Sequence, residues 1–323
     1  MTSALWIRTA GERIRVEPGS RFRSVVLECG ILEEPSDPAG LAVVVEDDRR
    51  PFDVTGWAMV GRGSWARDEE AVVRNVCSSG FDMHVETGEP EPTFTFRWRP
   101  PRRERAASSV LRSRTRLLHR AVLIQYPAMW RAVLRDRAPV HAPACTAGDL
   151  TVLLTGPSGV GKSTLIAGEV GAGGHAVSDN IVVTDGRTVW GLVEPMRSEI
   201  GSGRRMPHGR REDELPGRVP MLRPDHLVIL HRGTSQTTAG LRSCEPEEAA
   251  RALMASTYMA GELRRFWGFV AVMAAATGRG APHPPVAERA RDLAASLVCV
   301  ETTLPAGRIG IRELLGVQEM AKA

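Results

Sequence analysis

Residues 150–163 read LTVLLTGPSGVGKS, an apolar run that leads into a glycine-rich turn. The segment from Gly156 to Ser163 matches the pattern G-x-x-x-x-G-K-[ST] at every fixed position. An apolar strand is predicted before the match and a helix from about Lys162, which is the context that this pattern requires. Glycines let backbone N–H groups curl round a phosphate, and the helix N-terminus adds positive potential. The stretch therefore predicts an α/β fold built on a phosphate-binding loop.

The loop predicts a site for a nucleoside triphosphate, and we expect Mg-ATP. Lys162 would reach the β and γ phosphates, while the Ser163 hydroxyl would serve Mg²⁺, a hard cation that takes oxygen ligands. Lysine usage supports this role: of 42 basic residues 40 are arginine, and the only other lysine is Lys322. The interior lysine thus stands where a compact ammonium has to fit among phosphates. The predicted ATP-binding residues are Gly156, Pro157, Ser158, Gly159, Val160, Gly161, Lys162, Ser163 and Thr164.

The residues before the loop predict a separate, β-rich N-terminal domain. Short β-type runs at 24–27, 41–45 and 93–98 are separated by turn-rich stretches such as EEPSDPAG. An arginine-rich stretch at 97–116 follows, and then apolar residues recur at helical spacing, with Pro127 as a kink or break. We place the domains at residues 1–105 and 106–323.

The second domain shows alternating strand and helix patterns. Strands are predicted at 175–183 and 226–230, and Asp185-Gly186 between apolar runs predicts a hairpin. A long polar segment at 194–223 separates these strands, and we expect the remainder to be mostly helical, with a core helix around residues 263–270. This alternation is typical of an α/β architecture with a P-loop core.

Length and composition exclude several other classes of protein. A chain of 323 residues with 42% apolar residues can fill ordinary cores. Its longest apolar run, 266–276, is about half of the roughly 20 residues that a membrane-spanning helix needs. The first residues lack the features of a secretory signal. The five cysteines are widely spaced without the pairing of zinc sites, so we expect core thiols. We expect a soluble, cytoplasmic protein with no membrane partner.

An acid follows the helix that the loop opens. Asp179 lies at the end of the next predicted strand, 17 residues after Lys162 (179 − 162), whereas the strand at 226–230 ends in His231 and Arg232 and offers no acid. A carboxylate in this position can accept the proton of an acceptor hydroxyl or support the metal. Asp179 is therefore the candidate catalytic and metal-linked acid.

The stretch 139–183, PVHAPACTAGDLTVLLTGPSGVGKSTLIAGEVGAGGHAVSDNIVV, resembles the core of the HPr kinase/phosphorylase family. In that family a histidine precedes the loop strand and two aspartates follow the loop helix. His141 and Asp179 match the histidine and the first aspartate, whereas the second acid falls on Asn180. The resemblance implies a kinase fold akin to that of phosphoenolpyruvate carboxykinase, ATP and Mg²⁺ as cofactors, a serine or other hydroxyl as acceptor, and a homo-oligomer. It makes His141 a candidate catalytic residue, although a histidine at a strand start is more often simply packed.

The polar segment GLVEPMRSEIGSGRRMPHGRREDELPGR, residues 191–218, is a candidate lid. Arginines swung over the γ-phosphate would stabilise transition-state charge, and long loops of this kind are functional or disordered. A solvated charged loop explains the same residues. Glu194 and Arg197 are nearest the hairpin beside Asp179, so they are preferred to Arg204, Arg205, Arg210 and Arg211.

The sequence also leaves four alternative functions to consider. The acceptor can be a small molecule instead of a peptide or protein. Asn180 keeps a nucleotide-gated regulatory protein without transfer activity as an alternative, and the loop also resembles that of guanylate kinases, which carry it near their N-terminus. The eight arginines of 97–116 suggest nucleic-acid binding, but the mixed charges elsewhere and a net charge of only +4 favour an exposed helix face or linker.

Overall fold

The structure is a computed structural model that describes residues 4–35, 38–88, 90–198, 202–206, 209–233, 240–305 and 310–316. It is a mixed α/β protein that divides into two compact units. Unit 1 comprises Met1–Asp136 with Glu262–Pro284, and unit 2 comprises Arg137–Gly261 with Pro285–Ala323. The division falls later than the predicted boundary near residue 105, because the helices after that point pack with the N-terminal sheet. A second segment, 262–284, also returns to unit 1, which local sequence patterns do not reveal.

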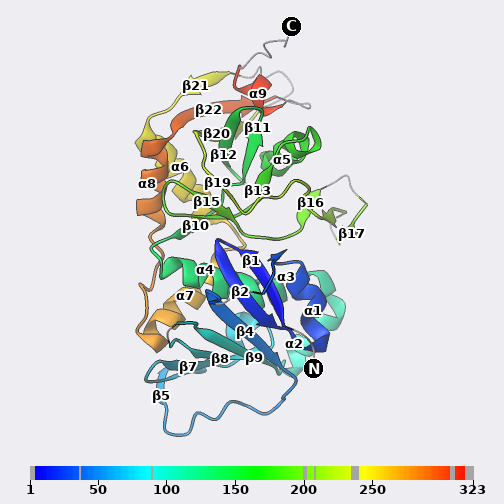
Figure 1. Cartoon of the computed structure of the whole chain (residues 1–323), viewed down its shortest axis with the longest axis vertical. Coiled ribbons are helices and arrows are strands. Elements are labelled where there is room, and N and C mark those ends of the chain that lie inside the picture. The colour runs from blue at the N-terminus through cyan, green and yellow to red at the C-terminus, as the bar shows by residue number, and fades with distance from the viewer. Residues whose placement is uncertain are drawn as a thin grey trace. The chain divides into compact units, whose positions relative to one another are not determined.

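Unit 1 contains a nine-stranded sheet in the order β3-β1-β2-β4-β9-β8-β7-β6-β5. Its central strands β2, β4 and β9 are parallel, and β9 to β5 form an antiparallel meander. The strands are β1 Leu5–Thr9, β2 Glu12–Glu17, β3 Ile31–Leu32, β4 Leu41–Glu46, β5 Ala58–Gly61, β6 Ser64–Arg67, β7 Glu70–Val73, β8 Phe81–Glu86 and β9 Thr93–Trp98. The helices are α1 Gly19–Leu27, α2 Arg102–Val110, α3 Arg112–Arg120, α4 Tyr126–Val133 and α7 Arg264–Thr277 (Figure 1).

Several sequence predictions for unit 1 can be compared with these elements. The strands at 41–45 and 93–98 are confirmed as β4 and β9, but residues 24–27 belong to helix α1. Pro127 lies in the first turn of α4, where its missing N–H costs nothing, and the helical path changes just before it, in the π-helical segment Ala121–Gln125. The predicted core helix is α7, with Leu263, Phe266 and Val270 buried.

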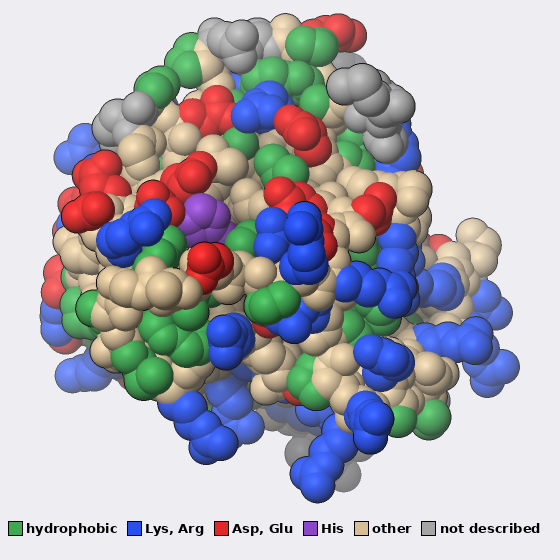
Figure 2. All heavy atoms as spheres, turned by 90° about the horizontal axis from the view of Figure 1, so that it is seen from below, with side chains coloured by type: hydrophobic (Ala, Val, Ile, Leu, Met, Phe, Trp, Pro, Cys, Tyr) green, Lys and Arg blue, Asp and Glu red, His purple; other side chains and the backbone are tan. Residues whose placement is uncertain are grey.

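Some arginines of the stretch 97–116 form ion pairs within unit 1. Arg97 pairs with Glu46 (Nε to Oε2, 2.6 Å), Arg99 pairs with Asp82, and Arg116 pairs with Glu28. The arginines of this stretch that remain exposed lie on α2 and α3, and they are Arg102, Arg103, Arg105, Arg112 and Arg114. In Figure 2 basic side chains gather on one part of the face shown and acidic side chains on another.

Unit 2 is built on a six-stranded sheet in the order β13-β11-β12-β20-β22-β21, in which β12, β20 and β22 run parallel. Smaller sheets have the orders β10-β14-β15-β19 and β16-β18-β17. The strands are β10 Ala138–Val140, β11 Ala144–Ala147, β12 Leu150–Thr155, β13 Ala176–Ser178, β14 Val182–Thr184, β15 Val189–Gly191, β16 Met196–Ser198, β17 Arg204–Arg205, β18 Arg211–Asp213, β19 Met221–Leu222, β20 His226–Arg232, β21 Leu241–Ser243 and β22 Val298–Leu304. The helices are α5 Lys162–Gly171, α6 Pro246–Met259, α8 Val286–Ser296 and α9 Ile311–Leu314.

Side chains of the parallel strands point alternately to the two faces of the main sheet, and each face packs into its own hydrophobic core. On one face Leu153, Leu227 and Ile229 pack with Leu253 of α6 and Leu293 of α8. On the other face Val152, Leu154 and Val228 pack with residues of α5 and α9, among them Ile166 and Leu314. A strand buried on both faces reads as a continuous apolar run, as LTVLLT does.

One prediction for unit 2 is wrong in detail. The stretch 175–183 is two strands, β13 and β14, which belong to different sheets, so Asp179 stands in the turn between them. The described part of the remainder after residue 230 is mostly helical, as expected, but it also contributes β21 and β22 to the main sheet. The Asp185-Gly186 hairpin is confirmed: β14 pairs antiparallel with β15. Within the described residues, no helix is long and apolar enough to cross a membrane.

The cysteines are free thiols, and Cys29, Cys145, Cys244 and Cys299 are buried while Cys77 is half-buried. The expectation of core thiols is thus confirmed for four of them.

Candidate functional site

The glycine loop joins β12 to α5 at the end of the main sheet. Gly156 has φ +144°, and a Cβ at this position would lie 2.5 Å from the carbonyl oxygen of Leu230 in β20. Glycine is therefore required where the loop leaves the sheet. Gly159 and Gly161 also have positive φ, +78° and +120°. Pro157, Ser158 and Gly159 form an exposed tip, Val160 is anchored in the core, and Thr164 is exposed in the first turn of α5.

Lys162 folds back across the loop. Its ammonium donates to the carbonyl oxygens of Gly156, at 2.8 Å, and Pro157, at 3.2 Å, and the residue is 6% exposed. These are charge-assisted hydrogen bonds. A phosphate entering the loop would compete with two carbonyls for the ammonium, and its full negative charges would favour the exchange.

Asp179 lies beside the start of α5. The Ser163 hydroxyl donates to the backbone oxygen of Asp179 at 3.3 Å, and the Asp179 side chain is buried. Burial, and next the charge of Glu194, raise the pKa of Asp179 to about 7, against the opposite influence of Arg197, Arg218 and the Ser163 hydroxyl. A carboxyl group with a pKa near neutrality can both take up and release a proton at cellular pH.

Glu194 supplies a second buried carboxylate at the site. Its Oε1 accepts a hydrogen bond from Nδ2 of Asn180 at 2.8 Å, and its Oε2 lies 3.6 Å from an Nη of Arg197. The amide of Asn180 carries no charge, but its hydrogen bond holds the Glu194 side chain in place. The charge of Glu194 acts on Asp179, so a second carboxylate lies near this acid although position 180 is an amide.

Arg218 is a residue of the site that the sequence analysis did not single out. Its Nη2 donates to the backbone oxygen of Glu194 at 2.7 Å, and its charge acts on Asp179. It comes from the chain just before β19, where it forms an isolated parallel bridge with Ala176. The only sequence signal was its membership of the polar segment, which contains many arginines.

His141 is linked to the loop through another side chain. Its Nδ1 lies 3.0 Å from Oγ of Ser256 in α6, and that hydroxyl lies 3.1 Å from the carbonyl oxygen of Gly156. The backbone N–H of His141 donates to Thr257 Oγ1 at 3.0 Å. His141 thus lies at the edge of the site and supports the loop through Ser256. No pattern in the sequence distinguishes Ser256 from other helical serines.

The outer part of the predicted lid is not a structureless loop. Strands β16, β18 and β17 form a small antiparallel sheet, in which Arg204 pairs with Glu212 and Arg211 Nη1 donates to the Gly203 carbonyl at 2.9 Å. Arg197 lies in β16 and contacts Glu194, whereas Arg204 and Arg205 are exposed. Residues 199–201 and 207–208 of this segment lie outside the described residues.

The donor set fits a hard divalent cation. Asp179 and Glu194 are two buried carboxylates, of which Asp179 lies beside the Ser163 hydroxyl, and the charge of Glu194 contributes to the raised pKa of Asp179. A cation between them would remove this repulsion, and carboxylate and hydroxyl oxygens are the ligands that Mg²⁺ prefers. Comparison with known proteins yields no matching family model and no matching curated protein.

Proposed function

We propose that the chain is an Mg-ATP-dependent kinase that transfers the γ-phosphate to a hydroxyl, with a serine of a peptide or protein as the preferred acceptor. The observation that carries the proposal is the pair Asp179 and Glu194, buried beside a glycine loop that presents Lys162 and Ser163. Unit 2 would then be a P-loop kinase core of the HPr kinase and phosphoenolpyruvate carboxykinase type, working in the cytoplasm. A loop that only binds nucleotide has no need of a buried acid whose pKa is near 7.

In this proposal the residues of the loop bind the phosphates, and the residues around Asp179 bind the metal. The loop N–H groups and Lys162 hold the β and γ phosphates after Lys162 releases the carbonyls of Gly156 and Pro157. Ser163, Glu194 and Asp179 would supply oxygen ligands for Mg²⁺ or its water shell. The bound ion would neutralise charge on the phosphate oxygens.

The acceptor oxygen forms a bond to the γ-phosphorus, the bond from that phosphorus to the bridging oxygen of ADP breaks, and the hydroxyl proton passes to Asp179. Arg197 and Arg218, both close to this acid, offset the negative charge that gathers there. His141 positions the loop through Ser256 and touches no reacting atom.

Transfer of labelled γ-phosphate to serine peptides, small hydroxyl compounds and water tests the proposal. Wild type is compared with Lys162→Ala and with Gly168→Ala on the same helix, where an added Cβ meets nothing within 4 Å. We expect transfer to one acceptor class, a loss of about a hundredfold or more in Lys162→Ala, and full activity in Gly168→Ala. Lysine-dependent ATP binding with no transfer to any acceptor would instead favour a nucleotide-gated regulatory protein.

A further inference from the structure

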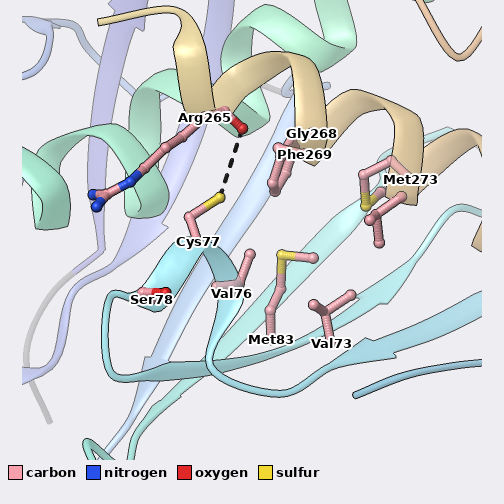
Figure 3. A pocket seen from close by; sticks show the side chains of 10 residues that line it. Val73, Val76, Cys77, Ser78, Met83, Arg265, Gly268, Phe269 and Met273 are labelled. Carbon is pink, nitrogen blue, oxygen red and sulfur yellow. Dashed lines mark hydrogen bonds between the residues drawn. The ribbon is translucent and has the colours of Figure 1, made fainter. Parts of the chain in front are cut away.

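Unit 1 contains a pocket between helix α7 and the strands β7 and β8 (Figure 3). Its volume is about 350 Å³, and its walls are mostly apolar, formed by Val73, Val76, Met83, Phe269, Val272 and Met273. A cavity of about 150 Å³ lined by aliphatic and aromatic side chains is enough to bind benzene. The pocket therefore has room for a larger apolar group.

A glycine in the middle of α7 opens this pocket. Gly268 lines it, and a Cβ at this position would meet no atom within 4 Å. Glycine inside a helix is about 1 kcal/mol less favourable than alanine. Packing does not require glycine at position 268, because a Cβ would fit there. The effect of glycine is that α7 places no side chain in the pocket at this position.

The opposite wall is a turn held in a strained conformation. Asn75, Cys77 and Ser78 have φ of 48°, 53° and 58°, in the left-handed region, which asparagine tolerates but which disfavours Cys77 and Ser78. The Asn75 backbone N–H donates to Asp82 Oδ1 at 3.0 Å, and Asn75 Oδ1 accepts from the Gly80 N–H at 2.9 Å. The turn is thus fixed in advance, and strain of this kind concentrates at ligand sites.

Polarity differs between the two ends of the pocket. Met273 lies at one end and Met83 between Val76 and Val73, while the Arg265 side chain extends past Cys77 at the other end (Figure 3). Among the described residues Arg265 is exposed and has no carboxylate partner. The Cys77 thiol points to the Arg265 carbonyl at 3.8 Å, and burial raises its pKa to about 11, so it is a neutral part of the wall.

We propose that this pocket binds a linear apolar chain that ends in a carboxylate, with the chain against Met83 and Met273 and the carboxylate beside Arg265. The charge of Arg265 at the rim and the size of the apolar interior both select this ligand class. The proposal concerns unit 1 and does not depend on phosphoryl transfer.

Calorimetric titration with butanoate, octanoate and the neutral analogue 1-octanol tests it on the full chain. We expect octanoate to bind more tightly than butanoate. Gly268→Leu places a side chain in the pocket and should weaken octanoate binding at least about tenfold, because less of the octanoate chain can then enter and leave water. Ala275→Leu, on the exposed side of the same helix, is the matched control and should bind as wild type does. Arg265→Gln should weaken octanoate by up to about fivefold and leave 1-octanol unchanged.

The variant Gly268→Leu should unfold no more easily than wild type, since it removes a residue of low helix propensity and its Cβ meets no atom within 4 Å. Equal octanoate affinity in wild type and folded Gly268→Leu would overturn the proposal, as would equal affinity for butanoate and octanoate. Dissociation of an oligomer by Gly268→Leu, measured by sedimentation, would also overturn it, since a second copy of the chain would then occupy the pocket.

Discussion

At the scale of single residues, burial changes the acid–base chemistry of two side chains. Asp179 holds its proton up to about pH 7 in the folded chain, whereas an ordinary aspartate loses it near pH 3.8. His119 is the opposite case: burial lowers its pKa to about 4 from 6.5. Each shift makes the free energy of unfolding depend on pH, with opposite signs.

For Asp179 the raised pKa means that stability is lost as pH rises from about 4 to 7, because the unfolded chain ionises freely and the folded chain cannot. We expect Asp179→Asn to melt at a higher temperature than wild type at pH 8, with the difference vanishing at pH 4. Thermal unfolding without nucleotide or metal measures it. The same variant should lose phosphate transfer, and unchanged turnover would show that Asp179 is not the acid or base of the reaction.

For His119 the lowered pKa means that stability is complete above about pH 6.5 and is lost as pH falls toward 4, because the unfolded chain takes up the proton first. The ring packs edge-on against Phe22 and Phe81, at centroid distances of 5.6 and 5.1 Å. The loss should reach about 3 kcal/mol by pH 4. In His119→Leu, denaturant unfolding at pH 7 and 4.5 should show a smaller drop than in wild type. An equal drop would assign the acid sensitivity to other groups.

At the scale of elements, the turn that carries Asp179 depends on how closely β15 approaches β13. A Cβ at Gly191 of β15 would lie 1.9 Å from the Val177 carbonyl oxygen, which belongs to backbone and cannot move aside. This close approach brings the end of β13, and with it Asp179, next to the segment that carries Glu194.

Two glycine-to-alanine variants should therefore have opposite effects on stability. Gly191→Ala should lower the free energy of unfolding by several kcal/mol, since β13 and β15 would be forced apart. Gly168→Ala in α5, where the added methyl meets nothing, should raise it by up to about 1 kcal/mol. Urea unfolding of both variants measures the difference. A mild effect of Gly191→Ala would mean that the two strands can separate without cost.

At the scale of the whole molecule, residues 106–136 and 262–284 belong with the N-terminal sheet. Trp130 of α4 is buried, and its ring packs edge-on against Phe94 of β9 at a centroid distance of 5.4 Å. A chain cut at residue 106 would expose this ring and the apolar residues around it.

The fragment 106–323 should therefore aggregate or show no cooperative unfolding. A chain that begins at 137 and replaces 262–284 with a short Gly/Ser linker keeps both cores of unit 2 and should fold. Circular dichroism during thermal unfolding distinguishes the two. A cooperative transition in the first fragment alone would mean that the boundary near residue 105 is the correct one.

The sequence by itself determined the features that depend on neighbouring residues. These are the strand, glycine loop and helix around Lys162, the Asp185-Gly186 hairpin, and the strands β4, β9 and β20. Each follows from local backbone preferences and from the period of apolar residues, which a short stretch contains in full.

Only the tertiary structure decided which distant residues meet. It split residues 175–183 between two sheets, brought Arg218 to Glu194, linked His141 to the loop through Ser256, and returned helix α7 to unit 1. Arg218 and Ser256 look like ordinary polar residues in the chain. Their roles come from packing between segments far apart in sequence, where burial and close approach set the charge interactions, and no local pattern contains that information.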